Sequence, residues 1–189
     1  AQSASKPSAR NLSDYAWAWG QFLGHDLDLT TSANGASVNG SAPIAVTDPS
    51  DPLGPNPIPF TRANFGIIQD RGGGRSPLNE VTSYIDASQV YGSSADRAAA
   101  LRTDGGLGAK LLTGANNLLP FNTAGLPNEN HGPTPASQLF LAGDVRANEN
   151  SLLTSLHTVF IREHNRLVDV IAAQQPALGA EQQYQLARK

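Results

Sequence analysis

The chain has 189 residues, about the size of one domain, and a formal net charge of −3 at pH 7. Hydrophobic residues make up 39% and charged residues only 15%, which excludes disorder driven by charge. The acidic balance leaves no basic stripe for a nucleic-acid backbone, and no apolar run approaches the roughly 18 residues of a membrane-spanning helix. The sequence contains no cysteine, which excludes disulfides, thiolate catalysis and cysteine-bound metals.

The first predicted element is an amphipathic helix over residues 13–28, with Ser13 as its N-cap. Gly20 and Gly24 interrupt it, and each costs about 1 kcal/mol relative to alanine in a helix interior. We therefore expect another body to pack closely against the helix at these glycines. The apolar residues that recur at helical spacing are Tyr15, Trp19, Phe22 and Leu23.

The middle of the chain is predicted to be mostly loop. Residues 31–79 are rich in Gly, Pro, Ser and Asn and sustain neither the helical nor the strand period. A short helix is predicted to begin at a Ser93-x-x-Asp96 capping box and to end at the glycines of residues 105–108. Residues 111–143 return to loop composition.

The longest periodic segment predicts one core helix over residues 148–175 that ends before Pro176. Residues 181–189 predict a further helix. The fold class is therefore mainly α, with long ordered loops. The predicted apolar stripe of the long helix consists of Leu153, Leu156, Phe160, Leu167 and Ile171.

Gln21 and His25 form the first candidate site. They lie four residues apart, so they share one face of the predicted first helix. Histidine is the side chain best suited to move a proton near neutral pH. The alternative is that His25 is a histidine at the edge of the core.

The second candidate site is a series of oxygen-bearing side chains. Asp26 and Asp28 adjoin His25, while further hydroxyls and carboxylates recur at every second residue of a later segment. Ca²⁺ prefers such oxygen ligands, although the EF-hand spacing is absent. The alternative is a half-buried strand whose Thr and Ser side chains face water. The alternating residues are Thr82, Tyr84, Asp86 and Ser88.

Arg146, Glu149 and Asn150 form the third candidate site. They lie three and four residues apart where the long helix begins, so their side chains can converge. An arginine at such a point could polarise a bound oxygen or anion. The alternative is a salt bridge at the start of the helix.

Three other histidines are present. His157 and His164 lie seven residues apart on one face of the long helix, which differs from the HExxH zinc arrangement. We interpret both as structural. His131 lies in a loop rich in proline and asparagine.

Taken together and in order, the three sites resemble the animal-type haem peroxidase family, the myeloperoxidase- and peroxidasin-like branch of the peroxidase–cyclooxygenase superfamily. The resemblance extends from about Asn11 to Lys189 and implies that residues 1–189 are the N-terminal portion, the distal half, of a helical catalytic domain. The absence of cysteines favours a bacterial-type member. The motifs are GQFLGHDLDLT at 20–30, TSYIDASQVYGSS at 82–94, LAGDVRANE at 141–149 and TSLHTVFIREHNRL at 154–167.

The resemblance implies a role for each distal residue. His25 would be the distal histidine, which takes a proton from one oxygen of hydrogen peroxide and delivers it to the other. Arg146 would stabilise the charge that develops as the O–O bond breaks. Gln21 would donate a hydrogen bond to the distal water or a small halide. The resemblance also implies a structural calcium ion, held by Asp26, Thr82, the backbone carbonyl of Tyr84, Asp86 and Ser88.

The resemblance further implies haem b as the cofactor. Glu149 would be the carboxylate that many members esterify to a haem methyl group, whereas Gly24 stands where they have a second such carboxylate. Asn150 stands where some members have a sulfonium-forming methionine, so that bond is excluded. At most one ester link can form, which disfavours chloride and leaves iodide, bromide, thiocyanate and phenolic donors open.

The family's proximal histidine lies on a later helix, and His131, His157 and His164 do not match it. The resemblance therefore implies a longer parent protein or a second polypeptide that completes the haem site, with this chain inactive alone. Secretion is an expectation from the family alone, because this chain contains no signal peptide that could indicate it. The alternatives are a non-catalytic calcium-binding fragment or pseudoenzyme, and a fatty-acid oxygenase of the same superfamily.

Overall fold

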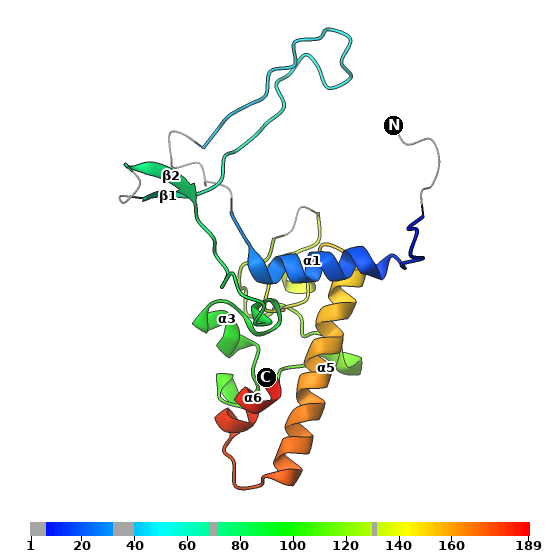
Figure 1. Ribbon diagram of the computed structural model, residues 1–189, viewed down its shortest axis with the longest axis vertical. Helices are drawn as coiled ribbons and strands as arrows, with labels where there is room; N and C mark the ends of the chain where they lie inside the picture. The colour runs from blue at the N-terminus through cyan, green and yellow to red at the C-terminus, as the bar shows by residue number, and fades with distance from the viewer. Residues whose placement is uncertain (1–6, 32–39, 69–71, 130–131) are drawn as a thin grey trace. The chain divides into compact units, whose positions relative to one another are not determined.

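The computed structural model describes residues 7–31, 40–68, 72–129 and 132–189. It divides into two compact units, one formed by Ala1–Leu27 with Thr82–Lys189 and the other by Asp28–Val81 (Figure 1). All the helices named below belong to the first unit. Most of the regular elements are helices, which confirms the mainly α fold class. His131 lies outside the described residues.

Helix α1 spans Tyr15–Leu27, within two residues of its predicted bounds at each end. It packs against the longest helix and against a short helix after residue 87. Its buried residues are Ala18, Phe22, His25 and Asp26. The predicted stripe is wrong in part, because Tyr15 and Trp19 are 47% and 44% exposed and Leu23 is only partly buried.

Helix α5 spans Ser151–Gln174, and α1 crosses its N-terminal end (Figure 1). Asn150 is its N-cap, since its side-chain oxygen accepts a hydrogen bond from the Leu153 backbone N–H at 2.8 Å. The helix therefore begins three residues later than predicted, because the cap leaves the preceding residues in turns.

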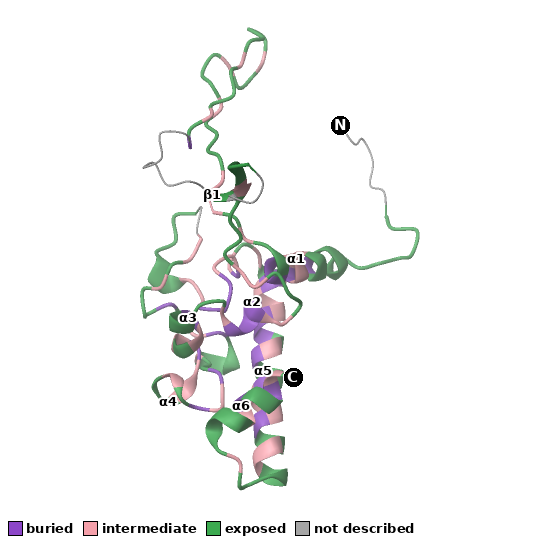
Figure 2. Cartoon of the chain, turned by 60° about the vertical axis from the view of Figure 1, so that its left-hand side comes forward, coloured by how far each residue is buried: buried purple, intermediate pink, exposed green. Residues whose placement is uncertain are grey.

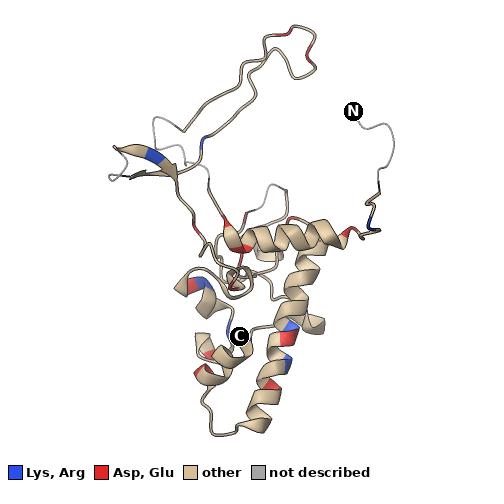
Figure 3. Cartoon of the chain, viewed as in Figure 1, with Lys and Arg blue, Asp and Glu red and all other residues tan. Residues whose placement is uncertain are grey.

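The buried face of α5 differs from the predicted stripe. Its residues are spaced by four, four, three and four positions along one side of the helix (Figure 2). Two of them are histidines, which an apolar pattern does not include. Apart from Leu153, the residues of the predicted stripe are only partly buried. The exposed face carries the charges Arg162, Glu163, Arg166 and Asp169 (Figure 3). The buried residues at this spacing are Leu153, His157, Ile161, His164 and Val168.

The remaining helices of the first unit are short. The predicted capping box is wrong by one residue, because Ser94 and not Ser93 caps α3 and accepts a bond from the Arg97 backbone N–H at 3.4 Å. The predicted single helix is broken at Arg102, whose extended backbone separates α3 from α4, and positive φ angles at Asp104 and Gly105 distort α4 itself. The segment predicted as a helix at 181–189 is confirmed as α6. The elements are α2 (Ser88–Tyr91), α3 (Ala95–Ala100), α4 (Thr103–Gly106), η2 (Ala115–Asn117), η3 (Ala136–Gln138) and α6 (Ala180–Arg188).

The second unit contains a β-hairpin. Strands β1 (Phe65–Ile68) and β2 (Gly74–Pro77) pair antiparallel, with Phe65 opposite Pro77. The composition of residues 31–79 predicts a long loop region and does not predict these two strands. The two strands are four residues each and contain Gly, Pro and Ser, so their sequences carry no alternating pattern.

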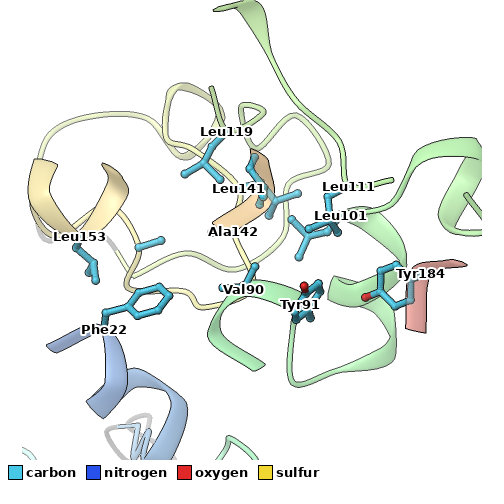
Figure 4. Close-up of a cluster of buried hydrophobic side chains, with 12 residues drawn as sticks. Phe22, Val90, Tyr91, Leu101, Leu111, Leu119, Leu141, Ala142, Leu153 and Tyr184 are labelled. Carbon is cyan, nitrogen blue, oxygen red and sulfur yellow. The ribbon is translucent and has the colours of Figure 1, made fainter. Parts of the chain in front are cut away.

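A single cluster of apolar side chains joins α1, α2, α5 and α6 (Figure 4). Phe22 of α1 lies against Leu153 of α5 and Val90 of α2 in this cluster, and each of the three is at most 1% exposed. Burying a side chain of this size contributes about 1.5–3 kcal/mol. The core thus fixes α1 and α5, the two helices that flank the first and third candidate sites. Within the described residues, no helix is both long and apolar enough to cross a bilayer.

Candidate functional site

Gln21 joins α1 to the segment that precedes α5. Its amide nitrogen donates to a carboxylate oxygen of Glu149, 128 residues later, and its amide oxygen accepts from the Asn150 side chain at 2.9 Å. Asn150 also caps α5 through its own side-chain oxygen. Both ends of the Gln21 amide are therefore fixed by the residues at the start of α5.

A second polar group links Arg146, Asp144 and His25. The Arg146 guanidinium donates to both carboxylate oxygens of Asp144, at 2.9 and 2.8 Å, and to the His25 backbone carbonyl at 3.2 Å. His25 Nδ1 lies 3.6 Å from Asp144 Oδ1. His25 and Asp144 are 6% and 3% exposed. The side chain of Asp144 therefore lies between the arginine and the histidine.

Asp144 is a site residue that sequence reasoning missed. Burial favours a raised pKa for its carboxyl group, but the hydrogen bonds and the charge of Arg146 outweigh burial and hold the pKa below its ordinary value. Its Oδ1 also accepts from the Arg146 backbone N–H at 2.8 Å. That bond is an Asx turn, in which an aspartate binds the N–H two residues on, so the Asp-x-Arg spacing could have revealed the pair.

Asp26 holds the predicted oxygen-rich segment against α1. One of its carboxylate oxygens accepts from the backbone N–H groups of Asp86 and Ala87, both at 2.9 Å. The other accepts from the Ser88 hydroxyl at 2.7 Å. Residues 83–86 form bends and α2 begins at Ser88, so the alternative of a half-buried strand is wrong. Asp28 is exposed and belongs to the second unit.

Four of the five predicted calcium ligands form one network. Asp86 Oδ1 accepts from the Thr82 hydroxyl at 3.1 Å and from the Ser88 backbone N–H at 3.0 Å, and Ser88 in turn donates to Asp26. The side chain of the fifth, Tyr84, is 73% exposed. No group of three His, Cys, Asp or Glu that could hold a metal is found among the described residues. The side chains of the network itself are two carboxylates and two hydroxyls. Such a set of oxygen ligands fits a hard cation rather than zinc.

The histidines of α5 are both in the core. His164 is 1% exposed and bonds to the Tyr91 hydroxyl and the Ala109 carbonyl. His157 is fully buried and packs edge-on against Phe22, with ring centroids 5.0 Å apart. Burial lowers the pKa of His157 to about 4, despite the raising effect of Asp144. Both therefore lie in the core and are neutral near pH 7.

The comparisons with known proteins identify the class. The family model described as animal haem peroxidase matches residues 1–189. The chain is 32% identical to thyroid peroxidase of Canis lupus familiaris over 94% of its length, and 33% identical to eosinophil peroxidase of Mus musculus over 97%. The chain belongs to the animal haem peroxidase family, a family of oxidoreductases.

Solved structures agree with this assignment. Peroxidase A of Dictyostelium discoideum matches with a TM-score of 0.85 at 29% identity over 99% of the chain, and fatty acid alpha-dioxygenase of Oryza sativa with 0.72 at 27% over 97%. The chain spans 22% of the canine relative, 30% of the murine one, 39% of the Dictyostelium structure and 27% of the rice structure. It therefore corresponds to a part of these proteins.

Proposed function

We propose that this chain supplies the distal side of a haem peroxidase, which uses hydrogen peroxide to oxidise small halide, pseudohalide or phenolic donors. The observation that supports the proposal is the meeting of Gln21 and His25 on α1 with Arg146 and Glu149, more than 120 residues later. These residues belong to separate segments, and the hydrogen bonds of Gln21 and Arg146 bring them together. A histidine, an arginine and an amide at one point are the groups that peroxide cleavage requires.

The residues of α1 fit a haem. A Cβ atom added at Gly20 or at Gly24 would meet nothing within 4 Å, so the side of the helix that carries these two glycines, next to Gln21 and His25, is open in this chain. We expected another body to pack there, and a flat macrocycle would fill that space. Glu149 would supply the one ester link, since Gly24 has no carboxylate. When bound, the haem iron would supply the redox chemistry of peroxide cleavage.

His25 would act as the proton carrier. Its Nδ1 faces Asp144, so we assign Nε2 to peroxide. Nε2 would take a proton from one oxygen of hydrogen peroxide and deliver it to the other oxygen, which then leaves as water. Asp144 holds the ring in orientation, and the guanidinium of Arg146 offsets the negative charge that develops on the oxygens. Gln21 would orient the distal water or a halide.

A calcium ion held by Asp26, Thr82, Tyr84, Asp86 and Ser88 is the second part of the proposal. Asp26 and Asp86 both line a cavity of about 570 Å³ from which an ion could enter. The ion would add coordination bonds to a network that already joins α1 to residues 82–88. Calcium would therefore fix the helix that carries His25.

Because the proximal histidine is expected outside this chain, the experiment adds hemin to this chain together with a polypeptide that carries that histidine, and then assays peroxidase activity with iodide and a phenol. We expect a cyanide-sensitive Soret band in the wild type. His25→Ala should keep the band and lose turnover, whereas Arg162→Gln, an exposed arginine of α5, should change neither. No Soret band in the wild type, or full turnover in His25→Ala, would refute the proposal. A second polypeptide with the proximal histidine and an extracellular location both stay predictions.

Two other functions are separated by the same preparation. The likeness to the rice dioxygenase favours a fatty-acid oxygenase as second candidate, which predicts oxygen uptake that depends on a fatty acid and not on peroxide. A non-catalytic calcium module predicts a melting temperature raised by calcium and no Soret band. A calcium effect alone would not distinguish that module from the peroxidase, because both predict its loss in Asp86→Ala.

A further inference from the structure

Tyr91 and His164 form a buried hydrogen-bonded pair outside the distal site. Tyr91 lies in α2 and His164 in α5, and they are 5% and 1% exposed. The Tyr91 hydroxyl lies 3.1 Å from His164 Nδ1, and the two rings meet edge to face at 5.4 Å. The pair is therefore held by both a polar and an aromatic contact, away from water.

The proton positions within the pair follow from its third member. His164 Nε2 lies 2.9 Å from the Ala109 carbonyl, which can only accept, so Nε2 carries the ring hydrogen. In a neutral imidazole the other nitrogen, Nδ1, is then an acceptor. The Tyr91 hydroxyl must donate to it. A phenol thus points its proton at an unprotonated base within hydrogen-bond distance, the geometry that proton transfer requires.

The surroundings keep both groups neutral at rest. Burial raises the pKa of Tyr91 to about 12, and burial also lowers the pKa of His164. The guanidinium of Arg188 lies 5.1 Å from the Tyr91 ring centroid, and that of Arg102 lies 3.9 Å from the Tyr184 ring centroid. Tyr184 contacts both rings of the pair, at 5.8 and 5.2 Å. The charge of Arg102 disfavours a resting imidazolium at His164, so the proton returns to the phenol when Tyr91 regains its electron.

We propose that Tyr91 and His164 are a redox-active pair, in which Tyr91 serves as an internal one-electron donor. The inference rests on the proposed function for its oxidant, a peroxide-oxidised haem. In the forward step Tyr91 loses one electron to that oxidant and its phenolic proton to His164 Nδ1, giving a neutral phenoxyl radical and an imidazolium. In the return step a small reductant supplies one electron, and the imidazolium gives its proton back. The oxidant gains the electron that the phenol loses.

The position of the pair connects it to the distal site. Tyr91 lies one helical turn after Ser88, whose hydroxyl donates to Asp26 at 2.7 Å, and Asp26 follows His25 in the chain. Tyr91 also belongs to the same apolar cluster as Phe22 of α1. An electron leaving Tyr91 toward α1 would therefore travel through packed atoms rather than through water.

The pair can be tested without haem, by flash oxidation of the purified protein with a ruthenium photo-oxidant and electron paramagnetic resonance after freeze-quenching. We expect a long-lived tyrosyl radical in the wild type. Tyr91→Phe should lose it, whereas Tyr15→Phe, which alters an exposed tyrosine, should keep it. Survival of the long-lived signal in Tyr91→Phe would overturn the proposal.

His164→Gln separates redox function from structure. A glutamine amide can still donate to the Ala109 carbonyl and accept from the Tyr91 hydroxyl, but it cannot take up the phenolic proton. We expect this variant to keep a melting temperature near that of the wild type and to lose the long-lived radical. A radical of unchanged lifetime in a folded His164→Gln variant would mean that the histidine is structural only, and the proposal would fail.

A second sample, loaded with hemin and mixed with hydrogen peroxide, distinguishes this inference from the proposed function. A Tyr91 radical in both samples supports both proposals. A radical after flash oxidation but none after peroxide leaves the pair intact and overturns the haem as its oxidant. No Tyr91 radical after flash oxidation overturns the pair, whatever the haem sample does.

Discussion

Replacing Gly24 by alanine tests whether the α1 face beside His25 is open. Glycine in a helix interior costs about 1 kcal/mol relative to alanine because the unfolded chain loses more freedom. At Gly24 the added Cβ meets no atom within 4 Å, and the same is true at Gly20. Nothing opposes the gain in helix stability, so we expect Gly24→Ala to stabilise the protein without haem by about 1 kcal/mol.

Gly143→Ala is the matched control with the opposite expected sign. Its Cβ would lie 2.5 Å from the Val90 carbonyl carbon and 2.6 Å from both the Gln89 oxygen and the Gly92 nitrogen. These are backbone atoms of α2 and its C-cap, which cannot turn aside as a side chain can. We expect a loss of about 1–3 kcal/mol, the usual cost of overpacking a core.

The assay is urea unfolding followed by circular dichroism, together with thermal melting. For a chain of this size 1 kcal/mol corresponds to a shift of about 2–4 °C, so Gly24→Ala should melt that much higher. The same variant should bind hemin more weakly, because its methyl group occupies the face assigned to the macrocycle. Loss of stability in Gly24→Ala would show that this face is covered within the chain. Unchanged hemin affinity would show that the haem does not bind at this face of α1.

Three further predictions concern buried titratable groups. Asp26→Ala leaves buried N–H groups without acceptors and should cost about 3 kcal/mol of unfolding free energy in urea, whereas Asp28→Ala, an exposed neighbour, should cost under about 0.5 kcal/mol. Asp144→Asn removes the carboxylate that balances Arg146 and should cost about 3 kcal/mol at pH 7. The pKa of Asp144 is lowered in the folded protein, so its contribution to the free energy of unfolding is complete above the ordinary value of 3.8. That contribution is lost as pH falls through the lower folded value. The loss of stability in Asp144→Asn should therefore shrink in acid. His157 has a folded pKa of about 4 against 6.5 unfolded, so stability should fall by about 3 kcal/mol as pH drops between those values, and His157→Leu should flatten that part of the unfolding profile.

The helices could be predicted wherever pattern and cap agree. α1, α5 and α6 lie within a few residues of their predicted bounds because each carries a periodic apolar face or ends at a capping residue or proline. The hairpin β1–β2 could not be predicted in this way. Its register depends on pairs such as Ile67 with Arg75, and on backbone bonds from neighbouring loops, including Leu78 N–H to the Asn64 carbonyl.

The candidate site shows the same division. Spacing on a helix was sufficient to bring Gln21 and His25 to one face, but it could not show that Glu149 and Asn150 bind Gln21 while Arg146 binds Asp144. Those contacts depend on turns before α5 that carry no periodic pattern. The buried face of α5 was misassigned for a related reason. His164 is counted as polar in a sequence, yet two hydrogen bonds satisfy it inside the core.

Asp26 explains why the two halves of the first unit meet where they do. Its carboxylate accepts from the backbone N–H of Ala87, a residue whose φ of 61° lies in the sparsely populated left-handed region. That strained turn directs Ser88 back to the other carboxylate oxygen and starts α2. The contact forms between protein atoms alone, so the proposed calcium ion would tighten the segment against α1 but is not needed to hold it there. The orientation of His25, the residue before Asp26 on the helix, therefore depends first on these hydrogen bonds and only then on the proposed calcium ion.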